Sequence, residues 1–99
     1  THTPGSETYN KIFMTAVQLF PDNPVANLNA ACISLMQRDV KSAGHYLEKA
    51  PEVPETALAK GVLYLLKNQY EEAESFFRQA KAAGLSQADD NLKRILELK

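Results

Sequence analysis

The chain lacks several features that, in many small proteins, indicate the cellular compartment or cross-link the fold. Cys32 is its single cysteine, so no internal disulfide can form and cysteine usage does not fix the redox compartment. No apolar run approaches the roughly 18 residues that are needed to span a bilayer. The sequence also has neither an initiator methionine nor a signal peptide, and we therefore expect it to be a piece of a longer protein.

The chain also lacks an excess of charge of either sign. Eleven basic and twelve acidic residues give a net charge of −1 and a pI of about 6.1. This balance leaves no electrostatic footprint for nucleic acid or for an anionic membrane, so we predict neither nucleic-acid binding nor direct membrane insertion. The hydrophobic fraction of 44% is ordinary for a globular chain, and 99 residues suit one small domain with one core.

Helical periodicity fills almost all of the chain. The stretch KNQYEEAESFFRQAKAAG places four apolar residues three or four positions apart on one helix face: Tyr70, Ala73, Phe77 and Ala80. No stretch shows the alternation and turn chemistry of a β-hairpin. We expect an all-α fold with six helical segments, at residues 7–20, 24–37, 40–50, 54–67, 70–83 and 87–98. Residues 1–6, with Pro4 and Gly5, are expected to be a linker or tail.

Local signals mark the ends of these segments. Asn23 precedes Pro24, which is the arrangement of an N-cap residue followed by a proline at the first helical position. Ser86 with Asp89 three residues later resembles a capping box. Gly84 suits the left-handed position just beyond a helix end.

The segments repeat. A shift of thirty residues aligns identical residues in five pairs: Pro24 with Pro54, Leu28 with Leu58, Leu35 with Leu65, Ala43 with Ala73 and Ala50 with Ala80. A shift of thirty-four aligns Phe13 with Leu47 and Ala16 with Ala50. We therefore expect stacked antiparallel helix hairpins in a domain over residues 7–99. It would consist of the second helix of an incomplete repeat (7–23), two repeats (24–53 and 54–85) and a closing helix (86–99).

Small residues have a physical role in this arrangement. Two helices approach to about 8 Å only where the facing side chains are no larger than Ala or Gly. We expect Ala31 to face Ala43 in one hairpin, and Gly61 to face Ala73 in the other.

The same residues carry a resemblance to a family. Gly61, Tyr64, Tyr70, Ala73, Phe77 and Ala80 stand at the spacing of the tetratricopeptide repeat, and TAVQLFPDNP resembles the end of such a repeat. The resemblance covers roughly residues 9–85 and implies a short solenoid of helix pairs. The family's usual Trp is replaced by Asn27 or Ala57. Its left-handed loop Gly is replaced by Arg38 or Asn68, and we expect some strain at Arg38. The middle repeat is four residues short, so Pro51 should end its second helix about one turn early.

A second resemblance concerns the cellular context. The run from Ala26 to Ala80 is similar to C-terminal repeat segments of Gram-negative outer-membrane proteins that also carry an OmpA-like module. This likeness implies a periplasmic, cell-envelope location for the chain. Without it the expected location is the cytoplasm, and the sequence by itself leaves the choice open.

Candidate catalytic residues fail on spacing. Cys32 and His45 could form a nucleophile and base pair, but the repeat register directs them to opposite sides, and a small buried or groove cysteine is the favoured interpretation. His2, Cys32 and His45 are too scattered to bind a metal. Glu71, Glu72 and Glu74 begin a helix, where carboxylates complement the helix dipole. We predict no enzyme activity, no metal and no cofactor.

The remaining candidate is an apolar surface. In tetratricopeptide proteins the first helix of each pair lines a concave groove, and the resemblance implies nine groove residues here: Leu28, Asn29, Cys32, Leu35, Met36, Leu58, Val62, Leu65 and Leu66. Either this groove is exposed, or the closing helix with Leu92, Ile95, Leu96 and Leu98 covers part of it, and both alternatives stay open. Asn29 matches the Asn of the chaperone-binding clamp, but Glu55 and Ala59 supply no cation for a terminal carboxylate, so we predict no such clamp.

Two functions follow from the sequence. The first is a protein–protein interaction scaffold, a segment of a larger protein that binds an apolar or helical peptide. The alternative is a purely structural domain that packs against its parent chain or a second copy, as a homodimer, with no separate ligand. An exposed groove would favour the first function, and a covered one would favour the second.

Overall fold

The computed structural model describes the backbone of residues 7–98 and the side chains of residues 11, 12 and 14–98. Within this range the protein is all-helical, as predicted, and has no strand. The chain forms two compact units, Thr1–Pro51 and Glu52–Lys99. The predicted tail at 1–6 lies outside the residues described.

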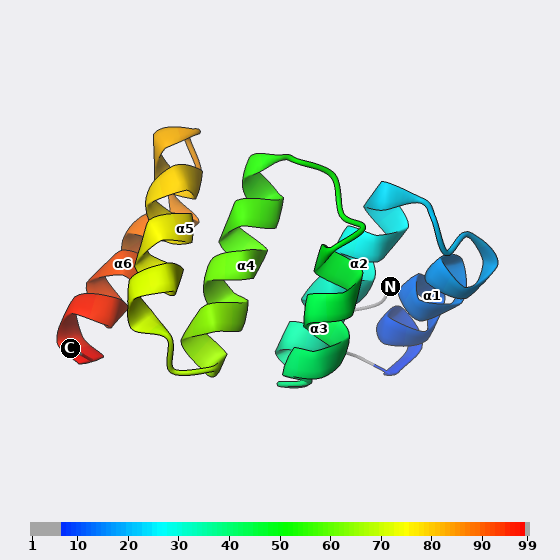
Figure 1. Ribbon diagram of the computed structural model, residues 1–99. Coiled ribbons are helices and arrows are strands. Elements are labelled where there is room, and N and C mark those ends of the chain that lie inside the picture. Colours follow the sequence, from blue (N-terminus) through cyan, green and yellow to red (C-terminus); the bar gives the residue numbers. More distant parts are fainter. Residues whose placement is uncertain (1–6, 99) are drawn as a thin grey trace. The chain divides into compact units, whose positions relative to one another are not determined.

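The first unit holds α1 (Glu7–Leu19), α2 (Pro24–Met36) and α3 (Val40–Leu47), and the second holds α4 (Pro54–Leu66), α5 (Tyr70–Ala82) and α6 (Gln87–Leu98) (Figure 1). Five of the six predicted segments agree with these bounds to within one residue. The third was predicted to reach residue 50 and is wrong there, because α3 ends at Leu47. Pro51 disfavours helical backbone at Ala50, and the N–H groups of Lys49 and Ala50 donate to carbonyls only three residues back.

The start of α2 is fixed by two asparagines. The Asn23 Oδ1 atom accepts a hydrogen bond of 3.0 Å from the Ala26 N–H, and Pro24 is the first helical residue, which confirms the predicted N-cap. Asn27 is buried, and its Nδ2 donates at 2.9 Å to the carbonyls of both Pro21 and Asn23. This amide therefore ties the connection from α1 to the first turn of α2.

Three helices end in the same way. Arg38, Asn68 and Gly84 have φ values of 58°, 63° and 100°, in the left-handed region. In each case the next residue's N–H donates to the carbonyl five positions earlier, the 6→1 bond of a Schellman ending: Asp39 to Ser34, Gln69 to Tyr64 and Leu85 to Ala80. The left-handed conformations predicted for all three positions are confirmed.

The start of α6 differs from its prediction. No hydrogen bond forms from the Ser86 side chain within the described part of the chain, so the expected capping box is wrong. The Asp89 carboxylate lies 2.8 Å from the Lys81 Nζ of α5. The Asp89 carboxylate, which the capping box would have used, therefore forms an ion pair with α5 instead.

Small residues hold the hairpin of the first unit together. Ala31 of α2 and Ala43 of α3 are completely buried, as the predicted close contact requires. On the other side of α2, Ala26 and Ala30 form a cluster with Val17 of α1. Thus α2 buries two faces within its own unit.

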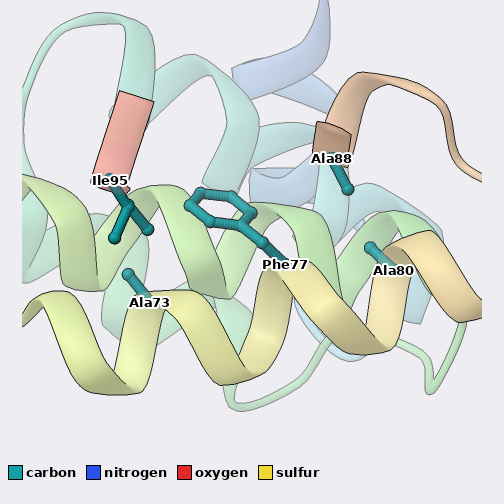
Figure 2. Packing of buried hydrophobic residues seen from close by; sticks show 5 residues of the cluster. All are labelled: Ala73, Phe77, Ala80, Ala88 and Ile95. Atoms are coloured by element: carbon teal, nitrogen blue, oxygen red, sulfur yellow. The ribbon is translucent and has the colours of Figure 1, made fainter. Parts of the chain in front are cut away.

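The core of the second unit is built around one aromatic ring. Phe77 is completely buried in a cluster with Ala73, Ala80, Ala88 and Ile95. Figure 2 shows Ile95 and Ala88 of α6 pointing toward α5, with the Phe77 ring among these side chains. The closing helix is therefore part of the core of this unit.

Gly61 of α4 makes room for the Phe77 ring. A Cβ atom at Gly61 would lie only 2.5 Å from Phe77 Cε1, well inside van der Waals contact. The sequence predicted that Gly61 faces Ala73 across the hairpin. In the structure the ring of Phe77, one turn further along α5, is the group that a side chain at Gly61 would strike.

Candidate functional site

The outward face of α2 is an exposed surface of the first unit without charge. Its sequence, PVANLNAACISLM, contains no charged side chain. Four residues spaced i, i+4, i+7 and i+11 follow one line along the helix, and we call them the α2 seam: Val25, Asn29, Cys32 and Met36. Val25 is 60% and Met36 51% exposed, Cys32 is exposed, and Asn29 is half-buried.

Three of these four residues belong to the predicted groove. Leu28 and Leu35, also predicted, lie beside the α2 seam and are half-buried. Val25 was not predicted as a site residue. The seven-residue spacing from Val25 to Cys32 was a signal in the sequence that could have included it, because residues seven apart share a helix face.

Local structure explains why this face points away from the unit. Ala31 is fully buried against the hairpin, and Ala26 and Ala30 pack toward α1, so the Cys32 side of the helix is left over. The capping by Asn23 and the tie from Asn27 fix where the helix begins. Rotation and register of the seam are thus set by side chains on the opposite sides of the same helix.

The predicted groove residues of α4 are placed differently. Leu58, Val62 and Leu65 are half-buried and pack against the cluster of α5 and α6 that surrounds Phe77. Leu66 is half-buried as well. The apolar side chains at three of the four predicted α4 positions therefore contribute to the core of the second unit.

Asn29 differs from the other polar side chains of α2. The Asn27 amide donates two hydrogen bonds, and the Ser34 hydroxyl donates to the Ala30 carbonyl at 2.9 Å. By contrast, the Asn29 amide forms no hydrogen bond with the residues that the structure describes. It is half-buried between apolar neighbours and retains its full donor and acceptor capacity.

The chemistry available at Cys32 is limited. Desolvation by neighbouring groups raises the pKa of its thiol even though the side chain reaches solvent. A raised pKa keeps the sulfur protonated at neutral pH, whereas a nucleophilic or metal-binding cysteine needs the thiolate. His45, the predicted alternative partner, is exposed on α3, and its ring lies 5.6 Å from that of Tyr46.

Among residues 7–98, no group of three or more His, Cys, Asp or Glu side chains could hold a metal ion. No helix in this range is long and apolar enough to cross a membrane. An open depression at the turn between α4 and α5 is lined by Asn68, Gln69, Tyr70, Glu71 and Glu72, where the Tyr70 hydroxyl donates to Asn68 Oδ1 at 3.3 Å.

Comparison with known proteins adds no further constraint: no family model, no curated protein and no solved structure matches this chain.

Proposed function

We propose that the chain is a non-catalytic protein-interaction scaffold of the tetratricopeptide-like kind, and that it binds an apolar or helical peptide segment along the α2 seam. The single observation that carries this proposal is the charge-free, exposed line of Val25, Cys32 and Met36. Exposed helix faces in soluble domains are normally rich in charged residues, and an apolar face without them is typical of an interaction surface.

The chemistry of the seam indicates the kind of ligand. With no cation or carboxylate on α2, a charged peptide end has nothing on this helix to pair with. Met36 and Cys32 are polarizable side chains that adapt to irregular apolar partners. A partner of this kind is another protein or a segment of the parent chain, and a parent with an OmpA-like module would place the interaction in the periplasm.

The purely structural function has its own support. Leu58, Val62 and Leu65 are engaged with the core of the second unit, so α4 contributes its apolar side chains to folding. We therefore propose that recognition is concentrated on α2, and that the α4 positions have mainly a structural role.

Footprinting at Cys32 tests the proposal at the seam itself. The purified chain is incubated with extract of the source cells and then pulsed with a maleimide, and the extent of Cys32 modification is measured by mass spectrometry. A bound partner should slow modification several-fold relative to buffer. In Met36→Glu the protection should disappear, because a carboxylate one turn from Cys32 must be desolvated for the partner to dock.

Gln18→Glu is the matched control, because it adds the same charge at an exposed position of α1, off the seam. It should keep the protection seen in the wild type. Equal modification of Cys32 with and without extract, or protection that survives Met36→Glu, would contradict the proposed function.

A further inference from the structure

The α2 seam has the spacing of a helix–helix interface. Positions i, i+4, i+7 and i+11 alternate steps of four and three residues, as in the a and d positions of a coiled coil. Side chains at this spacing fit between those of a second helix that runs at a shallow angle to the first. An extended strand, whose side chains repeat every two residues, does not match this spacing.

Asn29 lies inside the seam, between Val25 and Cys32. When a helix docks on the seam, the Asn29 amide loses contact with water and has no intramolecular partner to replace it among residues 7–98. A buried polar group without a hydrogen bond is strongly disfavoured. In coiled coils a single Asn in the seam accordingly selects partners that place a polar group opposite it, and so fixes their register.

The surface area of the α2 seam indicates which kind of partner it can hold. A helix of 13 residues is about 20 Å long, so a single seam covers on the order of 300 Å² of each partner. Stable dimers bury about 800 Å² per partner. The seam alone is therefore too small to hold two copies of the chain together, and it suits a short helix that binds reversibly.

We propose that Asn29 selects the ligand: the occupant of the α2 seam is a short amphipathic helix of another protein, with aliphatic residues along its own seam and one Asn or Gln opposite Asn29. This inference rests on the proposed function and goes beyond it, since it names the chemistry of the partner and the residue, Asn29, that recognises it. The partner's amide both donates to and accepts from the Asn29 amide, and the uncharged aliphatic residues contact Val25, Cys32 and Met36.

Three synthetic peptides test the assignment. They share one amphipathic helical sequence with four seam positions at i, i+4, i+7 and i+11. The first has Leu at all four, the second has Asn at the second position, and the third has Asn at the third. The last two place an amide opposite Asn29 in a parallel and an antiparallel complex respectively. Affinity for the full chain is measured by calorimetry or fluorescence anisotropy.

The wild type should bind one Asn peptide about ten- to hundredfold more tightly than the all-Leu peptide, since the latter leaves the Asn29 amide unpaired. In Asn29→Leu the preference should reverse in favour of the all-Leu peptide. Asn29→Ala should lose the preference without gaining the new one. Gln18→Glu should behave as the wild type, and thermal melting should show that all variants remain folded.

Several outcomes would overturn the inference. If the all-Leu peptide binds the wild type as well as either Asn peptide and Met36→Glu abolishes binding, the proposed function stands but Asn29 does not select the ligand. Binding of none of the peptides at about 1 mM would contradict a helical ligand of this chemistry. Self-association of the wild type that is lost in Met36→Glu would make a second copy the occupant instead.

Discussion

At the scale of single residues, two equivalent turns show how the same backbone geometry is met by different side chains. Arg38 and Asn68 both adopt left-handed backbone, at φ 58° and 63°. Asn tolerates this region better than other residues with a Cβ, and the Asn68 Oδ1 also accepts a hydrogen bond from Tyr70. Arg has no such compensation, so the strain predicted from the sequence falls mainly on Arg38.

Replacing these residues by glycine should separate the two cases. Arg38→Gly should stabilise the protein by up to about 1 kcal/mol, because relief of the left-handed strain exceeds the added entropy of the unfolded chain. Asn68→Gly should change stability little, since a favourable residue and one hydrogen bond are lost. Urea unfolding monitored by circular dichroism measures both. An equal or larger gain for Asn68→Gly would contradict the claim that the strain falls mainly on Arg38.

Gly61 is the second residue whose identity is dictated by a neighbour. Gly61→Ala would place a Cβ atom against the Phe77 ring, which is completely buried and has little room to move. Overpacking typically costs about 1–3 kcal/mol, and the better helix propensity of Ala returns at most about 1 kcal/mol, so a net loss is expected. A smaller ring substitute, Phe77→Leu, should reduce the cost of Gly61→Ala in a double-mutant cycle. Strict additivity of the two changes would contradict this contact.

Cys32 gives a prediction with a pH dependence. Desolvation raises the pKa of its thiol above the ordinary value of 9.0, so the folded state disfavours the thiolate. The protonated thiol therefore contributes to the stability of the folded state below pH 9, and this contribution is lost as the pH rises through the higher thiol pKa of the folded state. The iodoacetamide reaction rate should therefore rise at a higher pH in the folded chain than in the chain unfolded in urea. A folded-state midpoint at or below the unfolded one would contradict the desolvated environment.

At the scale of helices, periodicity and breakers predicted most boundaries, and α3 shows why the rest failed. The repeat shift of thirty residues matched α2 to α4 well, because both begin at a proline and end at a left-handed residue. The sequence predicted that Pro51 ends this helix early, but it missed that the N–H groups of Lys49 and Ala50 donate to carbonyls three residues back, so that the regular α-helix already ends at Leu47. Likewise the ion pair of Lys81 with Asp89 depends on how α6 packs, so the local capping pattern at Ser86 missed it.

The closing helix should be essential for the second unit. Ala88 and Ile95 of α6 are completely buried in the cluster around Phe77. A chain that ends after Ser86 would expose that ring and the alanines beside it, and terminal helices of repeat proteins are needed for solubility. We expect a lower melting temperature together with self-association in analytical ultracentrifugation. A truncated chain that stays monomeric with an unchanged melting temperature would show that α6 is dispensable.

At the scale of the whole molecule, the sequence predicted the helical fold and part of the candidate site. Periodicity and the small residues Ala31, Ala43 and Ala73 pointed to buried helix contacts that the structure contains. Eight of the nine predicted groove residues form four pairs at the thirty-residue shift, so sequence reasoning treated α2 and α4 alike. The structure distinguishes them because Leu58, Val62 and Leu65 pack on the Phe77 cluster, whereas Cys32 and Met36 remain exposed. That difference depends on tertiary packing, which repeat spacing does not encode.

The central claim is that α2 presents an exposed binding face and α4 a structural one. A paired measurement on Met36→Glu and Leu65→Glu tests this claim most directly. Each variant is melted, and each is then assayed for protection of Cys32 by source-cell extract. We predict that Met36→Glu keeps the wild-type melting temperature and loses the protection, because its carboxylate stays hydrated in the free protein. Leu65→Glu should lose roughly 2 kcal/mol or more of stability, because a charge replaces an apolar side chain of the core. An unchanged melting temperature for Leu65→Glu, or retained protection in Met36→Glu, would contradict the assignment.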